Sequence, residues 1–297
     1  MSETKTFLIS GVTGRQGGAS ARHLLRAGHR VKGLTHTPTN KERIRRMGCE
    51  PVVADLRDPS SLVPGLKGVE GFHVVTDFHA PRKETEDLRA WVEDEIRQGW
   101  GALQAARDAR VPHTVLGSVA LGGATGLPFH ATKSVLESLV RFWKLPCTIT
   151  RPPYFMDDWP NPEPWGRDWK KSGLIRQAVP PDTPVPHIAT DDVGRAVAWA
   201  FDHPEKSIGQ TWELVGEVTT YPAIGRTLSK LWNRPVQFEE LPEAEGEVLD
   251  GLLRRKEVSL DVSGWERTFG FRMTTFQEMA DRLRTDAIER RKGAVRS

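Results

Sequence analysis

Cysteine and long apolar runs are scarce in this chain of 297 residues. The two cysteines, Cys49 and Cys147, lie far apart in the sequence and match no metal-ligand spacing. Small disulfide-stapled domains carry many more cysteines, so this pattern indicates a reduced, cytoplasmic protein without a metal site. No apolar run approaches the roughly 20 residues that a membrane-crossing helix needs, and the N-terminus has no charged-then-apolar export pattern. We therefore expect no membrane association.

Clustered basic charge is missing as well. The formal net charge is +3, and Lys and Arg are spread along the chain except in the C-terminal stretch RLRTDAIERRKGAVRS, where acids are mixed in. A nucleic-acid surface usually needs a basic face or stripe. Direct nucleic-acid binding is therefore not expected.

A glycine-rich turn is the most specific feature that the chain does have. An apolar run at residues 7–9 ends before Gly11, and Gly14 and Gly17 follow at three-residue intervals before a helical pattern. Strand, glycine turn and helix form the context of a dinucleotide-binding fingerprint. The glycines permit a tight turn, approach of a pyrophosphate and close helix packing, while the helix N-terminus offers free N–H groups. The predicted cofactor-binding residues of this turn are Gly11, Thr13, Gly14, Arg15, Gln16 and Gly17.

The end of the second strand bears on the choice between NAD and NADP. In NAD-specific folds this strand usually ends in Asp or Glu, which holds the ribose hydroxyls. Here it ends in Thr35 and His36. Four basic residues follow nearby, namely Lys41, Arg43, Arg45 and Arg46. Because no acid there would repel a 2′-phosphate, we predict that NADP(H) is preferred, with NAD(H) as the alternative, and that Thr35, His36 and Lys41 contact the cofactor.

Three further apolar runs end in polar or loop residues. CEPVVADLRD ends its strand at Asp55 and Leu56, GFHVVTDF ends at Thr76 and Asp77, and HTVLGSVA ends at Ser118. Helical patterns separate these runs, notably over residues 84–110, which predicts a parallel, doubly wound α/β sheet. Ligands of such sheets bind at the carboxyl ends of the strands, so we predict cofactor contacts from all five of these residues.

Four separated blocks of the sequence resemble the NmrA-like family, an atypical branch of the short-chain dehydrogenase/reductase superfamily. They are GVTGRQGGASARHLL, VVADLRDPSSL, HATKSVLESLVRFWKLPCTITRPPYFMDDW, and the segment from VPHIATDD to WNRPV. The resemblance implies a doubly wound parallel-sheet Rossmann fold with a smaller C-terminal α/β cap domain. We place the Rossmann domain at residues 1–152, with 187–215 returning to it, and the cap at 153–186 and 216–297.

The resemblance also exposes a missing catalytic group. Short-chain dehydrogenases place a tyrosine four residues before a lysine, but here Phe129 stands four residues before Lys133. In that superfamily the lysine binds the nicotinamide ribose and lowers the pKa of the tyrosine, which passes the proton. Loss of the tyrosine removes the proton donor and leaves the ribose contact. We therefore predict that Lys133 binds the cofactor.

Other groups are candidates for a part in catalysis besides Lys133. His130 titrates in a suitable range, but one residue along a helix turns by about 100°, so it faces elsewhere unless the helix begins only near Thr132 as its N-cap. A structural role for His130 is the favoured interpretation. Ser118 matches the superfamily serine that holds a carbonyl oxygen. Tyr154 follows the sixth strand and could face the nicotinamide, as a cofactor contact or in catalysis.

The segment after the sixth strand is rich in proline and in tryptophan, with Trp159, Trp165 and Trp169. These rings either line an apolar pocket beside the nicotinamide or pack the lid onto the body.

Two functions follow from the resemblance. One is an NADPH-dependent reductase of a small conjugated carbonyl or quinone-like substrate. The other is a non-catalytic NADP(H) sensor that acts through a regulatory protein partner. A homodimer is an option in either case.

Overall fold

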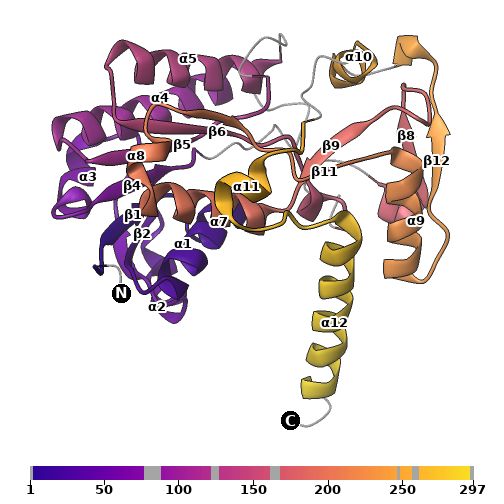
Figure 1. Cartoon of the computed structure of the whole chain (residues 1–297), viewed down its shortest axis with the longest axis horizontal. Helices are drawn as coiled ribbons and strands as arrows, with labels where there is room; N and C mark the ends of the chain where they lie inside the picture. The colour runs from indigo at the N-terminus through magenta and orange to yellow at the C-terminus, as the bar shows by residue number, and fades with distance from the viewer. Residues whose placement is uncertain are drawn as a thin grey trace. The chain divides into compact units, whose positions relative to one another are not determined.

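The computed structural model describes residues 3–76, 88–121, 127–160, 168–245, 248–255 and 261–294. The chain divides into two compact units (Figure 1). The first consists of Met1–Pro152 and Thr190–Leu214, and the second of Pro153–Ala189 and Val215–Ser297.

A seven-stranded sheet forms the centre of the first unit. Its order is β10–β6–β5–β4–β1–β2–β3, and every neighbouring pair runs parallel. The strands are β1 (Thr6–Ile9), β2 (Arg30–Thr35), β3 (Glu50–Val53), β4 (Gly71–Val74), β5 (His113–Gly117), β6 (Cys147–Arg151) and β10 (Thr211–Glu213). The inner strands β1, β4 and β5 are buried on both faces, which explains why their sequences do not alternate in polarity. The chain order reverses between β1 and β4, where parallel sheets bind their ligands.

Helices cover both faces of this sheet. On one face lie α1 (Arg15–Arg26) and α7 (Thr190–Asp202), and Phe201 of α7 stacks on Phe7 with ring centroids 4.5 Å apart. On the other face, which Leu8 points to, α3 (Pro59–Leu66), α4 (Leu88–Asp108) and α5 (Pro128–Phe142) share one apolar cluster with the strands. The shorter helices are α2 (Lys41–Arg46), α8 (Pro204–Ser207) and the 3₁₀ turn η1 (Pro38–Asn40). The predicted doubly wound parallel fold is confirmed.

Helices α1 and α7 pack unusually closely. A Cβ added at Gly194 would lie only 2.5 Å from the backbone carbonyl carbon of Ala19. At the same contact, Asp191 binds His23 at 3.1 Å and Arg22 at 3.0 Å. These hydrogen bonds hold the pKa of Asp191 well below its usual range, first through His23 and then through Arg22. The contact fixes the direction of α1, and with it the position of the glycine turn at its N-terminus.

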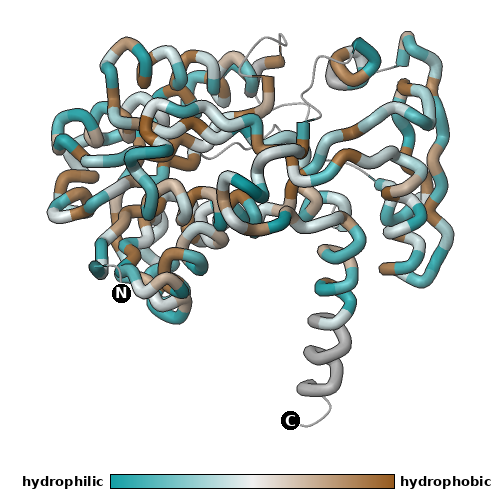
Figure 2. The backbone as a smooth tube through the Cα atoms, viewed as in Figure 1, coloured by the Kyte–Doolittle hydropathy of each residue, from teal (hydrophilic) through white to brown (hydrophobic). Residues whose placement is uncertain are grey.

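The second unit is a smaller α/β assembly. Its three-stranded sheet has the order β11–β9–β7, and a separate parallel pair joins β8 and β12. The strands are β7 (Tyr154–Phe155), β8 (Leu174–Gln177), β9 (Val185–Ile188), β11 (Glu217–Thr219) and β12 (Gln237–Glu240). The helices are η2 (Met156–Asp158), α6 (Trp169–Ser172), α9 (Tyr221–Trp232), η4 (Glu243–Glu245), α10 (Val248–Arg254), α11 (Trp265–Phe269) and α12 (Phe276–Ala294). Helix α12 packs on α9, and its described side chains are largely hydrophilic (Figure 2). Among the helices that the structure describes, none combines the length and hydrophobicity of a membrane span.

Helix α5 begins at Pro128, which rules out the alternative of a start near Thr132. Leu127 is the N-cap, and a proline at the first helical position is favoured because its φ is preset and its missing N–H is not needed there. The Thr132 hydroxyl is buried and donates to Glu95, so it does not cap the helix. Residues 129 and 130 therefore both lie on the helix.

The strands before the predicted contact residues end slightly earlier than the sequence indicates. Strands β3, β4 and β5 end at Val53, Val74 and Gly117. Asp55, Thr76 and Ser118 thus lie in the loops that follow the strands. That placement keeps them at the carboxyl edge of the sheet.

Candidate cofactor-binding and active site

The turn after β1 forms a glycine cradle at the start of α1. Gly11 has φ +60°, a conformation that favours glycine, and its carbonyl accepts the N–H of Gly14 at 2.8 Å. A Cβ at Gly17 would lie 2.4 Å from the carbonyl oxygens of Ser10 and Gly11. Gly14 is the N-cap of α1. Because glycine has no side chain, it accepts no hydrogen bond from the N–H groups of the first helical turn. Such an end of a 12-residue helix is suited to phosphate.

Gln16 adds a polar group beside this cradle. Its Oε1 is buried and has no hydrogen-bond partner within the described part of the chain. The same atom lies 3.6 Å from the position of a Cβ built on Gly117, at the end of β5. A buried amide oxygen without a donor costs on the order of 1–3 kcal/mol, which a ligand N–H or O–H would recover. The glycine cradle, the uncapped helix and this oxygen together fit a dinucleotide.

The loop after β2 brings a cation back to the glycine turn. Arg43 of α2 donates from Nη2 to the carbonyl of Thr13 at 2.9 Å. The Thr35 hydroxyl accepts the N–H of Thr37 at 3.1 Å, which shapes the loop, and His36 is exposed beside it. Lys41 begins α2 and is also exposed. The acid of this helix, Glu42, is paired with Arg45 at 2.8 Å.

Asp55 and Leu56 have different environments. The guanidinium of Arg57 binds Asp55 at 2.7 Å, and this hydrogen bond holds the pKa of the carboxyl below its usual value. Leu56 belongs to the apolar core, and its carbonyl lies 2.2 Å from the position of a Cβ built on Gly101. Leu56 therefore has only backbone groups to offer a ligand. Its side chain stabilises the packing of α4.

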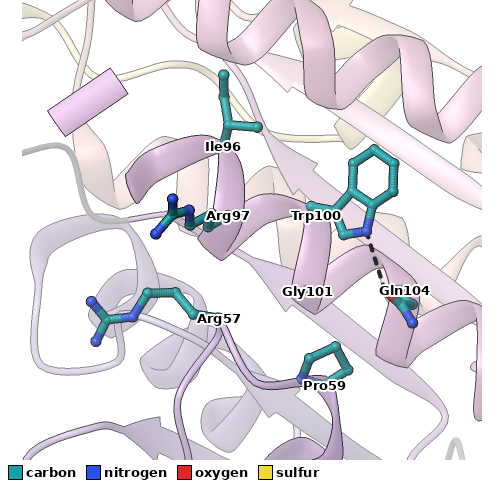
Figure 3. Close-up of a pocket in the computed structure, with 7 residues that line it drawn as sticks. All are labelled: Arg57, Pro59, Ile96, Arg97, Trp100, Gly101 and Gln104. Carbon is teal, nitrogen blue, oxygen red and sulfur yellow. Dashed lines mark hydrogen bonds between the residues drawn. The ribbon is translucent and has the colours of Figure 1, made fainter. Parts of the chain in front are cut away.

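Next to this loop lies a groove of about 330 Å³ on the outer side of α4 (Figure 3). Trp100 and Ile96 give it apolar walls, and Trp100 donates to Gln104 at 3.1 Å. The guanidinium of Arg57 is already bound to Asp55 and to Asp94. A second arginine, Arg97, also lines the groove and pairs with Glu93 at 3.6 Å. It lies outside the glycine turn and the Lys133 environment.

Lys133 lies in a buried polar network of three elements. Its ammonium is 2.8 Å from Oε1 of Glu95 on α4 and donates to the hydroxyl of Thr76, in the loop after β4, at 2.5 Å. The Thr76 hydroxyl donates to Oε1 of Glu95 at 2.8 Å, and Thr132 donates to Oε2 at 2.5 Å. Glu95 is fully buried, and the Lys133 side chain is 11% exposed. The network therefore places one compensated ammonium at the carboxyl edge of the sheet.

Ser118 lies in a second buried cluster. Its hydroxyl donates to Glu137 of α5 at 2.7 Å, and Arg151 pairs with the same carboxylate at 2.5 Å. Burial raises the pKa of Glu137, but hydrogen bonds from Arg151 and Ser118 outweigh it and hold the pKa below its usual value. Since the hydroxyl proton of Ser118 is already donated to a carboxylate, the oxygen of Ser118 can act toward a ligand only as an acceptor.

The other candidate residues do not join these clusters. His130 is 3% exposed, and burial lowers its pKa to about 4, so its ring is neutral at pH 7 and a weak acid. Tyr154 belongs to the second unit, where its ring centroid lies 5.6 Å from that of His187. Asp77 and the side chain of Phe129 lie outside the described residues.

The tryptophans of the cap segment pack inside the second unit. Trp159 and Trp169 are buried and stack with centroids 4.8 Å apart, and Trp159 donates from Nε1 to His187 at 2.9 Å. These two rings therefore pack against residues of their own unit. Trp165 lies outside the described residues.

Sequence reasoning missed two residues that complete the site, Glu95 and Glu137. Glu95 shares one face of α4 with Gly99, Ala102 and Leu103, at the spacing i, i+4, i+7 and i+8. A lone acid in a stripe of small and apolar residues is the signal that could have revealed it, because buried acids need partners. Glu137 follows a similar rule, since it shares a face of α5 with the buried Lys133 and Val140, four residues before it and three after it.

Comparison with known proteins gives a family match and several similar structures. A sequence model of the NmrA-like family matches residues 3–279. The triphenylmethane reductase of Citrobacter sp. in complex with NADP(H) is 19% identical, with 93% of this chain and 99% of that one covered and a TM-score of 0.74. An NADPH-dependent quinone oxidoreductase of Escherichia coli in complex with NADPH is 18% identical, with coverages of 93% and 99% and a TM-score of 0.72.

A third similar structure holds the other cofactor. It is a short-chain dehydrogenase/reductase superfamily protein of Agrobacterium tumefaciens with bound NAD. Its sequence is 18% identical to this one, and the superposition covers 98% of this chain and 100% of that chain with a TM-score of 0.73. At these identities the likenesses establish the fold.

Proposed function

This chain belongs to the NmrA-like family, and on that basis we propose that it binds NADP(H) and reduces a small quinone-like or conjugated carbonyl acceptor. The observation that carries the proposal is the buried ammonium of Lys133 at the carboxyl edge of a doubly wound sheet. Each part of the site contributes separately.

The cofactor would be held by the glycine turn and by Lys133. The pyrophosphate would bind at the N-terminus of α1, in the cradle of Gly11, Gly14 and Gly17. The Oε1 atom of Gln16 would accept a hydrogen bond from an N–H or O–H group of the cofactor. Lys133 has one ammonium N–H left for the nicotinamide ribose. When bound, the nicotinamide supplies a hydride.

Preference for NADP(H) over NAD(H) is part of the proposal. The similar solved structures include complexes with each of the two cofactors. In this chain Arg43 reaches the glycine turn, and His36 and Lys41 are exposed on the same loop and helix. A guanidinium beside the adenosine ribose is the group that recognises a 2′-phosphate best, because it can donate two parallel hydrogen bonds.

The polar groups around Lys133 favour an acceptor that tolerates slow protonation. His130 is neutral and buried, and the Ser118 proton is engaged by Glu137. A general acid contributes typically 10²- to 10⁴-fold to a rate, and neither of these two side chains supplies one. Reduction of a quinone gives a weakly basic phenolate-type anion that does not need a proton at once. Simple ketones give a strongly basic alkoxide that needs a proton at once.

A non-catalytic NADP(H) sensor is the second candidate function. The internal bonds of Lys133 and Ser118 favour it, because both side chains are occupied by carboxylates rather than directed to a substrate. In that role the cofactor state would be reported to a protein partner.

Single-turnover oxidation of protein-bound NADPH tests the proposal. We expect quinones and conjugated enones to oxidise the bound cofactor, and simple aldehydes and ketones to do so far more slowly. Lys133→Ala, assayed at NADPH concentrations that saturate it, should lose most of the rate. Bound NADPH that stays reduced with every quinone and enone would contradict the reductase proposal and favour the sensor.

A further inference from the structure

We propose that Glu95 is a positioning residue for the cofactor, acting through Lys133. This inference rests on the proposed function, because it assumes that Lys133 binds NADP(H). It assigns a role to a carboxylate that lies 19 residues from Thr76 and 37 residues from Thr132 in the sequence.

The first step is that Glu95 is fully buried and fully satisfied. Its Oε1 accepts the Thr76 hydroxyl and pairs with Lys133, and its Oε2 accepts the Thr132 hydroxyl. These donors come from the loop after β4 and from α5, whereas Glu95 itself is on α4. A buried carboxylate is costly unless it is paired and hydrogen-bonded, so its presence in the packed face of α4 calls for a role that an apolar side chain could not fill.

The second step is that Glu95 restricts the ammonium of Lys133. A lysine side chain has four rotatable carbons and loses much rotamer entropy when it is held in one place. Two of its three N–H groups are directed to Glu95 and Thr76. The third has no acceptor among the residues that the structure describes. Because the first two bonds hold the nitrogen, the third N–H is oriented before a ligand arrives.

The third step concerns charge. The Lys133 side chain is almost buried, so its positive charge needs a counter-charge nearby. Glu95 is the acid in contact with it. The two threonine hydroxyls hold the carboxylate in turn, and neither can replace its charge. Glu95 therefore both compensates the charge of Lys133 and orients its ammonium, whereas a neutral hydrogen-bonding residue at position 95 would supply no counter-charge.

A double-mutant cycle on NADPH binding tests this inference. The dissociation constant is measured by titration of NADPH fluorescence for the wild type, Glu95→Gln, Lys133→Met and the double variant. We expect each single substitution to weaken binding about tenfold, as for loss of one charge-assisted hydrogen bond. The double variant should bind no more weakly than Lys133→Met, because Glu95 acts only through Lys133.

The same four proteins without cofactor provide a second readout. Lys133→Met leaves Glu95 buried without its counter-charge, so we expect its thermal midpoint to fall below that of the double variant. Glu93→Gln serves as the matched control, since this acid lies one half-turn earlier on α4 and is exposed beside Arg97. It should change neither the affinity nor the midpoint. If Glu95→Gln does not fold, Thr132→Val removes one donor from Glu95 and should weaken NADPH binding in the same direction.

The outcomes separate the two proposals. Additive losses of affinity in the cycle, or wild-type affinity in Glu95→Gln, would overturn the role of Glu95 while leaving NADPH binding intact. A wild-type protein that does not bind NADPH would overturn the proposed function and this inference together.

Discussion

The residues that matter most at the site are held by acids from other elements. Lys133 is bound by Glu95 and Ser118 by Glu137, and both carboxylates are buried. Such pairs are worth little when exposed, but breaking a buried one leaves an uncompensated charge. The chemistry available to Lys133 and Ser118 is therefore set by their partners as much as by their own functional groups.

Arg43 offers a test at the residue scale. We expect Arg43→Gln to weaken NADPH binding about tenfold and to leave NADH binding nearly unchanged, because a charged contact to the 2′-phosphate is lost. Isothermal titration with each cofactor measures both affinities. Arg46→Gln, on the same helix and also exposed, is the matched control. Equal losses for both cofactors would indicate that Arg43 supports the glycine turn through Thr13 instead.

At the scale of elements, the contact of α1 with α7 determines where the glycine cradle lies. It has no room for a side chain at Gly194, and Asp191 ties the start of α7 to the middle of α1. The helix that begins the cofactor site is therefore positioned by a helix that follows it by more than 160 residues.

We expect Gly194→Ala to lower the free energy of unfolding by roughly 1–3 kcal/mol, because the added Cβ would meet backbone that cannot move aside. Urea denaturation followed by circular dichroism measures the change. Gly251→Ala in α10 is the control: its added Cβ meets only the end of the Arg255 side chain, and alanine favours helix. It should be neutral or slightly stabilising. A Gly194→Ala protein as stable as the wild type would mean that the two helices can separate at no cost.

At the scale of the whole molecule, buried neutral histidines make the fold sensitive to acid. Burial lowers the pKa of His73 to about 3. It lowers the pKa of three further histidines to about 4, namely His113, His130 and His187. An unfolded chain binds these protons near pH 6.5. Between about pH 4 and pH 6.5 the unfolded chain therefore binds more protons than the folded protein. The free energy of unfolding is highest above about pH 6.5 and falls as the pH drops toward 4.

We therefore expect the urea midpoint to decrease from pH 7 to pH 5, before carboxylates with lowered pKa values take up protons. The expected loss is on the order of 1–2 kcal/mol for each histidine at pH 5. His73 lies in β4, and neither of its ring nitrogens has a hydrogen-bond partner within the described ranges. His73→Leu should therefore flatten the pH dependence. A midpoint that does not change between pH 7 and pH 5 would contradict this account.

Much of the fold could be predicted from local patterns. The glycine turn, the apolar runs and the helical stretches between them predict a parallel, doubly wound sheet, because their periods and breaks reflect backbone geometry that neighbouring residues set. Element ends were less accurate. Helix α5 begins at Pro128, one turn before Thr132, which was the alternative start, since capping signals compete locally and tertiary contacts select among them.

The sequence by itself determined the type of fold, the glycine cradle and the replacement of tyrosine by Phe129, because each depends on residues adjacent in the chain. Only the tertiary structure decided the partners of the candidate side chains. Thr76, Glu95 and Lys133 come from separate segments, and His130 is neutral because packing removes water from it. Side-chain contacts and desolvation depend on which distant elements pack together. The spacing of residues along the chain does not predict that packing.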